Sequence, residues 1–551
     1  MNGLVMQQPL LISSLLVHAE RHHGDQEVVS RRVEGDIHRT TYRELAVRSR
    51  KMAKALAGLG VRAGDRVATL AWNGYRHLEL YYAVSGSGAV LHTLNPRLHP
   101  DQVVYIADHA EDQVLFFDLT FLPLIEAIAG RVKTIRHFVA MTDRAHMPAS
   151  PKVANLLCYE DLLEPHDDRL EWPTFDEAAA SSLCYTSGTT GNPKGVLYSH
   201  RSTVLHAYAG CMPDVLGLSG RDSVLAVVPM FHANAWGLPY NAPMTGAALV
   251  LPGPKMADPA TLTDLIESEN VTMAAGVPTV WTGLLAYLEQ SGRRIPSLER
   301  TVVGGSAVPL KMIREFAEQH GVTVLQGWGM TEMSPLGTTT RFNKGERQLP
   351  DAERFAITAK AGRPVFGCEM KIIDDAGNDL PQDGSISGNL VVRGPWIVSG
   401  YMKGDGRSQF LEDDWFMTGD VCKIEPDGSV VITDRSKDVI KSGGEWISSI
   451  DLENAAVGCE GVAEAAAIGI PHPKWDERPL LVCVRAPGSE VCAATIRNHL
   501  TAHVAKWWLP DAIEFLDELP HTATGKLSKK TLRDQFRDYR FANAQDMVGR
   551  D

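Results

Sequence analysis

The sequence predicts an α/β protein with a large N-terminal domain of parallel-sheet βαβ units, a small β subdomain, and a small mobile α+β C-terminal domain. Three observations support this prediction. Short β-branched runs alternate with helical stretches before residue 330, and short strands and turns follow Gly362. Beyond Arg435 the pattern becomes that of a compact α+β unit. A chain of 551 residues is also too long for a single core, so we expect it to divide into domains.

The parallel sheets are predicted from the order of strands and helices. Buried strands are expected at residues 65–70, 223–228, 247–251, 271–274, 301–303 and 322–325. Helices are expected at residues 258–269, 279–290 and 310–319. Because a strand, a helical crossover and a second strand form a parallel pair, this order predicts βαβ units. The apolar stretch at residues 9–17 is short and lacks a preceding basic segment, so it predicts an amphipathic helix rather than a signal peptide.

The β subdomain is predicted from short strands with Gly- and Asp-rich breaks. Residues 388–393 and 428–433 have this character, and Asp427-Gly428 is a strong hairpin signal. We place the large domain at residues 1–436, with its β subdomain at about 363–436, and the C-terminal α+β domain at 437–551. The sequence contains no internal repeats.

Composition excludes several classes of protein. No apolar run approaches the length of a transmembrane helix, and the eight scattered cysteines are typical of reduced thiols in a cytoplasmic protein. A net charge of −13 argues against nucleic-acid binding. Polyanionic ligands would therefore need locally basic sites, such as the group Lys437, Lys441, Lys526, Lys529 and Lys530. For Lys529 and Lys530 we expect an ordinary solvated surface.

The segment from Tyr185 to Gly195, YTSGTTGNPKG, has the composition of a phosphate-binding loop. Its glycines allow the backbone to approach an anion closely, while its hydroxyls and Lys194 supply donors and positive charge. The order differs from a Walker A motif, because Pro193 separates the glycines from Lys194. A kinase or GTPase P-loop is therefore excluded.

This loop resembles the signature of the adenylate-forming superfamily, which includes acyl-CoA synthetases, luciferases and peptide-synthetase adenylation domains. Further motifs of the superfamily follow in order at residues 229–236 (PMFHANAW), 304–307 (GGSA), 327–332 (GWGMTE), 415–420 (WFMTGD), 434–438 (DRSKD) and 524–526 (TGK). Within that superfamily the set of motifs is most similar to that of bacterial medium-chain fatty-acid:CoA ligases and 3-(methylthio)propionyl-CoA ligases. The resemblance covers most of the chain.

The resemblance implies a two-step reaction that uses ATP, Mg²⁺ and CoA. A carboxylic acid is joined to AMP with release of pyrophosphate, and the acyl group then passes to the thiol of CoA. The expected ATP-binding residues are Thr186, Ser187, Gly188, Thr189, Thr190, Lys194, Gly305, Ser306, Gly327, Trp328, Thr331, Asp420, Arg435 and Lys526. Asp420 and Arg435 would bind the ribose, Trp328 would flank adenine, and Glu332 would hold Mg²⁺.

The expected catalytic residues are Lys526, His232, Thr186 and Glu332. Lys526 would stabilise the charge that develops as the carboxylate meets the α-phosphate. Lys437 occupies the family's hinge position. Rotation there would bring in the residues expected to serve CoA transfer, which are Lys441, Gly443, Gly444 and Trp446.

The acyl pocket is expected to comprise His232, Trp236, Trp281, Gly304 and Gly329. Glycine at 329, where acetate-specific relatives have Trp, predicts a deep pocket and a medium-chain acid. A 3-(methylthio)propionate ligase of the same mechanism remains an alternative, as does an adenylation protein that loads a carrier protein. The partners are then a small carboxylic acid, ATP and CoA, with no nucleic acid and no membrane span, and a homodimer is left open.

Overall fold

The computed structural model describes residues 1, 3–150, 152–186, 192–442, 445–522 and 527–541. Two large sheets form the N-terminal part. The first contains, in spatial order, β16 (Arg363–Pro364), β15 (Leu336–Thr339), β14 (Thr323–Gly329), β13 (Arg300–Gly304), β12 (Met273–Gly276), β10 (Ser223–Ala226), β11 (Ala248–Leu251), β1 (Glu27–Arg31) and β2 (Ile37–Thr41). Strands β1, β10, β11, β12, β13 and β14 pair in parallel, and the strands at its two ends pair antiparallel.

The second sheet has seven strands. In order they are β7 (Leu157–Cys158), β6 (His137–Ala140), β5 (Asp112–Phe117), β3 (Arg66–Leu70), β4 (Val90–Thr93), β8 (Ala180–Thr186) and β9 (Lys194–Ser199). Every pair in it is parallel except β8 with β9, which form an antiparallel pair. The prediction of parallel-sheet βαβ units is therefore confirmed.

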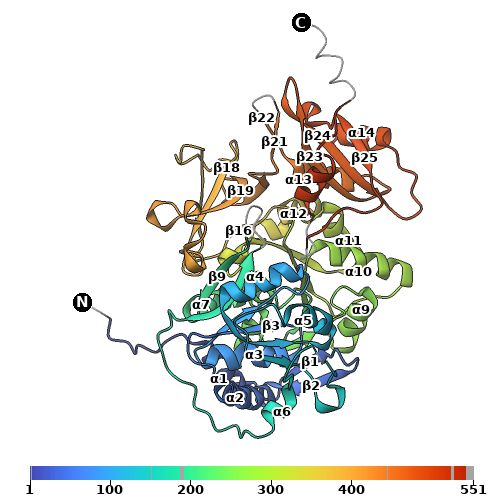
Figure 1. The fold of residues 1–551 in the computed structure, drawn as a ribbon. Coiled ribbons are helices and arrows are strands. Elements are labelled where there is room, and N and C mark those ends of the chain that lie inside the picture. Colours follow the sequence, from blue (N-terminus) through green and yellow to red (C-terminus); the bar gives the residue numbers. More distant parts are fainter. Residues whose placement is uncertain (2, 151, 187–191, 443–444, 523–526, 542–551) are drawn as a thin grey trace.

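Helices separate the two sheets and cover their outer faces (Figure 1). Packed between the sheets are α1 (Ile12–His22), α2 (Tyr42–Gly58), α3 (Tyr75–Gly86), α7 (His200–Cys211) and α8 (Leu238–Thr245). Outside the nine-stranded sheet lie α9 (Pro259–Ser268), α10 (Pro278–Ser291), α11 (Leu310–His320) and α12 (Asp351–Thr358). Outside the seven-stranded sheet lie α4 (Pro100–Ala110) and α5 (Leu122–Ile128), and α6 (Tyr159–Leu163) packs beside α2.

The central strands of these sheets are buried on both faces, as parallel sheets require. Along β13, Val302 packs into the cluster between the sheets and Val303 into the cluster under α10 and α11. This alternation explains why the strands are continuous apolar runs in the sequence. Helix ends follow local signals: Thr41 and Glu44 form a capping box at α2, and α10 starts with Pro278 and is capped after Ser291 by Gly292.

The β subdomain is a separate antiparallel sheet. Its strands, in order, are β17 (Glu369–Ile373), β18 (Gly388–Arg393), β19 (Phe416–Ile424) and β20 (Val430–Arg435). The next sheet begins at Ile440, so the connection between the two sheets contains the predicted boundary at Ser436–Lys437.

The C-terminal unit lies above the rest in Figure 1 and has its own core. Its strands are β21 (Ile440–Ser442), β22 (Glu445–Ile447), β23 (Val462–His472), β24 (Asp476–Arg485) and β25 (Ala512–Phe515). Its helices are α13 (Ser449–Val457), α14 (Ala493–Thr501) and α15 (Lys529–Gln535). Across the described residues, no helix is both long and apolar enough to cross a membrane.

Candidate active site

Three of the predicted nucleotide-binding residues meet where β14 approaches the β subdomain. Trp328 Nε1 donates a hydrogen bond to Asp420 Oδ2 at 3.0 Å, and Arg435 Nε lies 3.2 Å from Asp420 Oδ1. Asp420 and Arg435 are direct partners across β19 and β20. Asp420 is only 4% exposed, so both of its oxygens are held in place. An indole, a carboxylate and a guanidinium are thus gathered from separate segments, as the binding of a nucleoside would require.

The glycines beside this corner allow the backbones to approach closely. Gly304 and Gly327 pair across β13 and β14. A Cβ atom on Gly304 would lie 2.8 Å from the Gly327 oxygen and 3.2 Å from Trp236 Cη2. The structure therefore brings Gly304 and Trp236 of the predicted acyl pocket next to Gly327 of the predicted nucleotide site. Gly305 and Ser306 follow directly, Gly305 with a φ of +87° and Ser306 exposed.

Thr331 and Glu332 lie just beyond β14, in the short helix η4 (Thr331–Met333), and both are buried. The Tyr198 hydroxyl donates to the Thr331 carbonyl at 2.6 Å. The Tyr401 hydroxyl donates to Glu332 Oε1 at 2.7 Å. Burial raises the pKa of Glu332, although this hydrogen bond acts to lower it.

The carboxylate of Glu332 fits the predicted role of a metal ligand. Among the residues that the structure describes, it forms no ion pair within 4.0 Å, and the neutral Tyr401 hydroxyl is the side-chain partner of its Oε1. A buried carboxylate that forms no direct ion pair is stabilised by a hard divalent ion, and Mg²⁺ prefers oxygen ligands. The group is therefore suited to Mg²⁺ held together with phosphate oxygens.

Thr186 and Lys194 bracket the predicted phosphate loop. They are partners across the antiparallel pair β8 and β9, so the two ends of the loop are fixed next to each other. Lys194 Nζ donates to Gln409 Oε1 at 2.7 Å and lies 4.9 Å from the centre of the Tyr401 ring. Ser187, Gly188, Thr189 and Thr190 lie outside the described residues.

The motif at residues 229–236, called the acyl motif because it carries His232 and Trp236 of the predicted acyl pocket, contains a left-handed turn. Ala233, Asn234, Ala235 and Trp236 have φ angles between +44° and +56°, and Gly237 continues the turn at +87°. For residues other than glycine this conformation costs roughly 1–2 kcal/mol each. Such strain persists only where the surroundings enforce it, and it is concentrated at functional sites. Half-buried His232 precedes the turn, and half-buried Trp236 is carried by it to Gly304.

Buried polar side chains hold this turn in place. Asn234 Nδ2 donates to Ser182 Oγ at 3.0 Å, and the Tyr81 hydroxyl lies 3.2 Å from Asn234 Oδ1. The same hydroxyl donates to the Met230 carbonyl at 2.5 Å. Asn234 and Tyr81 were absent from the sequence-based set of site residues. The signal that could have found Asn234 is a polar amide in the apolar motif at residues 229–236, where burial requires partners.

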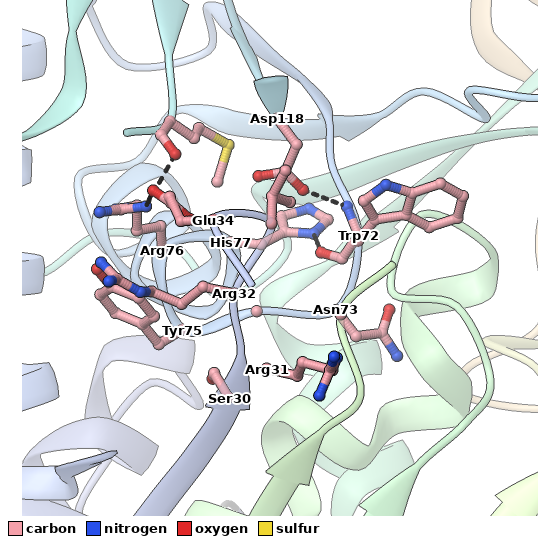
Figure 2. Close-up of a pocket in the computed structure, with 14 residues that line it drawn as sticks. Ser30, Arg31, Arg32, Glu34, Trp72, Asn73, Tyr75, Arg76, His77 and Asp118 are labelled. Atoms are coloured by element: carbon pink, nitrogen blue, oxygen red, sulfur yellow. Dashed lines mark hydrogen bonds and ion pairs between the residues drawn. The ribbon is translucent and has the colours of Figure 1, made fainter. Parts of the chain in front are cut away.

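Asn73 holds the backbone at the start of the acyl motif. Its amide donates to the carbonyls of Ala226 and Val228, at 2.7 and 2.8 Å, and accepts from Met230 N at 2.7 Å. Figure 2 shows Asn73 and Trp72 in a separate depression at the ends of β1, β3 and β5, which includes none of the predicted site residues. This depression is therefore distinct from the predicted site and is linked to residues 229–236 through Asn73.

Trp281 lies elsewhere. It is fully buried on α10, in the cluster outside the nine-stranded sheet, with its ring 6.1 Å from that of Phe316. Trp236 packs against the cluster on the other face of that sheet. The prediction that Trp281 forms a wall of the acyl pocket is wrong, because the indole is part of the packed core.

The glycine at 329 has a local explanation. A Cβ atom there would lie 1.8 Å from the Pro335 carbonyl oxygen and 3.2 Å from Gly337 N, at the bulge where β14 meets β15. The close approach of two backbones requires glycine at this position, whatever acid is bound. The inference of a deep pocket from Gly329 therefore does not follow from the identity of the residue.

The predicted second-step residues are described only in part. Lys437 is exposed between β20 and β21, and Lys441 is exposed on β21. Gly443, Gly444, Lys526 and the side chain of Trp446 lie outside the described residues.

Lys529 corrects the expectation of a solvated basic face. Its Nζ lies 2.8 Å from Glu453 Oε1 and donates to the Ser449 hydroxyl, and its side chain is 11% exposed. This lysine is therefore part of a buried ionic contact at the start of α15, because Glu453 would otherwise be a buried charge without a partner. Lys530 is exposed, as expected.

Comparison with known proteins shows one family over most of the chain. Residues 16–402 match the family described as AMP-binding enzyme, and residues 451–526 match the AMP-binding enzyme C-terminal domain. The chain is 53% identical over 538 residues to a 3-methylmercaptopropionyl-CoA ligase of Ruegeria lacuscaerulensis, which covers 98% of this chain and 99% of the relative. It is 51% identical over 538 residues to a medium-chain-fatty-acid–CoA ligase of Ectopseudomonas oleovorans, with 98% of each chain covered. The solved structure of an anthranilate CoA ligase in complex with anthranoyl-AMP matches with a TM-score of 0.86 and 28% identity, over 96% of this chain and 98% of that one.

Proposed function

Because the chain belongs to the AMP-binding enzyme family, we propose that it activates a carboxylic acid with ATP and transfers the acyl group to CoA. The observation that carries this proposal is the contact of Trp328 and Arg435 with the two oxygens of Asp420. These groups come from three strands, β14, β19 and β20. They are suited to an adenosine with its ring against Trp328 and its ribose hydroxyls on Asp420.

In the first step, a carboxylate oxygen forms a bond to the α-phosphorus of ATP, and the bond to pyrophosphate breaks. Thr186, Lys194 and the loop between them would hold the β- and γ-phosphates. Thr331 would contact the α-phosphate, and Glu332 would hold Mg²⁺. When bound, Mg²⁺ would neutralise phosphate charge and orient the leaving group. His232 would lie beside the acid, and Lys526 would stabilise the charge at the reacting oxygens.

In the second step, the thiol of CoA attacks the acyl carbon and AMP leaves. Lys437 would act as the hinge, and rotation there would replace Lys526 by the segment that contains Lys441, Gly443, Gly444 and Trp446. Support comes from the position of Lys437, which is exposed between the sheet that ends at Arg435 and the sheet that begins at Ile440.

For the acid we propose a medium-chain fatty acid, with 3-methylmercaptopropionate as the second candidate. Both are apolar carboxylates, and residues 231–236 contain no acidic side chain that would pair with a substrate amine. Trp236, packed over Gly304, offers an apolar wall. The second candidate is favoured by the 53% identical relative, whose name gives that activity.

A pyrophosphate-release assay tests the reaction. We expect release to require both ATP and an acid, and CoA to be converted to an acyl thioester in the same mixture. Acyl-AMP formation without thioester formation would instead support an adenylation protein that loads a carrier. Values of kcat/KM for acetate, butyrate, octanoate, palmitate and 3-methylmercaptopropionate decide between the two candidate acids.

Two further properties remain proposals. We propose a cytoplasmic location, supported by eight cysteines that are all free thiols, as is typical of a reducing compartment. A homodimer is also proposed, and light scattering at several protein concentrations would test it.

A further inference from the structure

Lys194 is held in a socket formed by a segment that no sequence motif identified. The segment connects β18 to β19 and contains Tyr401, Gly406 and Gln409. Gln409 accepts a hydrogen bond from Lys194 Nζ at 2.7 Å, and the ring of Tyr401 lies 4.9 Å from that nitrogen. Gly406 has a φ of +62°, and a Cβ there would lie 2.7 Å from Lys194 Nζ and 2.9 Å from the Tyr401 ring. Glycine is therefore needed to leave room for the ammonium group.

Tyr401 also contacts the predicted metal ligand. Its hydroxyl donates to Glu332 Oε1 at 2.7 Å, and the residue is 6% exposed. The rings of Phe410 and Phe416 pack against it, with centres 5.8 and 6.4 Å away. The backbone of Glu332 is fixed too, because its carbonyl accepts from Val398 N at 2.9 Å. Both the ring and the carboxylate are therefore fixed before any ligand arrives.

Tyr401 contacts two groups of opposite charge, Lys194 through its ring and Glu332 through its hydroxyl. Within the described part of the chain, no ion pair of 4.0 Å or less joins Lys194 to Glu332. The face of an aromatic ring attracts a cation, and a phenolic hydroxyl donates to a carboxylate, so one side chain satisfies both groups. If the two charges met directly, each would neutralise the other, and neither would be available to phosphate or metal.

We propose that Tyr401 is a positioning residue of the nucleotide site, which keeps Lys194 and Glu332 apart and oriented for ATP and Mg²⁺. Gln409 holds Lys194 Nζ in the place of a phosphate oxygen until ATP binds. An amide oxygen is a weaker acceptor than a charged phosphate, so ATP displaces it. This inference rests on the proposed function, because it takes Lys194 as a phosphate ligand and Glu332 as a metal ligand.

The first test separates the two contacts of Tyr401. Tyr401→Phe retains the ring under Lys194 and removes the hydroxyl from Glu332. Isothermal titration should show about tenfold weaker binding of MgATP, the loss typical of one hydrogen bond to a charged group, and unchanged binding of ATP in EDTA. The Mg²⁺ concentration for half-maximal pyrophosphate release should rise by a similar factor. Tyr401→Leu removes both contacts and should weaken binding with and without Mg²⁺.

Gln409→Leu provides an independent test. It removes the acceptor that ATP must displace, so the dissociation constant of ATP in EDTA should fall by about threefold. Weaker ATP binding by a folded Gln409→Leu protein would overturn the role given to Gln409.

A matched control comes from another buried tyrosine that donates to a glutamate. The Tyr159 hydroxyl donates to Glu79 Oε2 at 2.6 Å, and neither residue is among the predicted site residues. Tyr159→Phe should lower the free energy of unfolding but leave both ATP affinities unchanged. If Tyr401→Phe behaves like this control, or weakens ATP binding equally in EDTA and in Mg²⁺, Tyr401 is only structural. If the wild-type protein binds MgATP but releases no pyrophosphate with any acid, the proposed function fails, and the titrations still decide the role of Tyr401.

Discussion

Asp434 Oδ2 accepts a hydrogen bond from the backbone N–H of Ser449 at 2.8 Å, which joins the end of β20 to the first turn of α13. The Ser448 hydroxyl adds a bond to the Thr433 carbonyl at 2.6 Å. These contacts lie beside the proposed hinge at Lys437, and Lys529 reaches the same place through the Ser449 hydroxyl. The C-terminal unit is thus docked on the β subdomain by buried polar groups rather than by apolar packing alone.

Removal of the Asp434 carboxylate should loosen this docking. Asp434→Ala leaves the Ser449 N–H and hydroxyl without their acceptor, at a cost of about 1–3 kcal/mol in the free energy of unfolding. Urea unfolding measures this cost, and limited proteolysis should show faster cleavage near residues 436–439. Exposed Asp517→Ala is the control. Equal protease resistance of the two variants would show that the contact does not hold the units together.

Asp420→Asn tests the proposed nucleoside corner. The amide oxygen can still accept from Trp328 Nε1, but the charge that pairs with Arg435 and would bind the ribose is lost. We expect ATP to bind at least about tenfold more weakly, with little change in thermal stability. Equilibrium titration with ATP measures this effect, and Asp427→Asn serves as a control in the same subdomain. Unchanged affinity would place the nucleoside elsewhere.

Asn234→Leu should damage recognition of the acid while sparing ATP. The substitution removes the amide that contacts the Tyr81 and Ser182 hydroxyls, and these contacts hold the left-handed turn that carries Trp236. We expect kcat/KM for the acid to fall by about tenfold or more and KM for ATP to stay within about twofold. Exposed Asn155, which also has a positive φ, provides the control Asn155→Leu. Parallel changes in both substrates would mean that the turn supports the whole site.

Gly329→Ala should lower the stability of the protein rather than change its preference among acids. The methyl group would overlap the Pro335 carbonyl, whose backbone must move to admit it. Activity toward octanoate and propionate should fall together, with a lower melting temperature, and the ratio of the two activities should hold. Gly345→Ala has room for its methyl group and is the control. A selective loss of octanoate activity in a stable variant would restore Gly329 as a determinant of pocket depth.

His206 should make the protein less stable in acid. Burial lowers its pKa to about 4, and its Nε2 accepts from Leu336 N at 3.2 Å, so the ring is neutral in the folded state. Because the pKa of His206 is lower in the folded than in the unfolded protein, the neutral ring contributes its full stability above the ordinary pKa of 6.5. This contribution is lost as pH falls toward 4. The full effect is about 3 kcal/mol. His206→Gln retains an acceptor without a titrating ring, so urea unfolding of this variant should lose less stability between pH 7 and 5 than the wild type. Identical pH slopes would contradict the assignment.

Patterns within short stretches of sequence determined much of this protein. The strands expected at 301–303 and 388–393 are β13 and β18, and the helix expected at 279–290 is α10, because apolar periodicity reflects burial directly. The ordered motifs also pointed to the family, since phosphate and ribose chemistry requires particular residues in particular loops. Trp328, Asp420 and Arg435 were named from those motifs, and they meet in the structure.

Only the tertiary structure decided which long-range partner each side chain has. Trp281 and Trp236 look alike in the sequence, but they pack on opposite faces of one sheet, because the direction of a side chain depends on which element carries it. Gly329 is explained by the Pro335 carbonyl just before the next strand, Lys529 by a glutamate on another helix, and the socket of Lys194 by residues more than 200 positions away. Such contacts depend on how the chain folds back on itself, and no local pattern in the sequence encodes them.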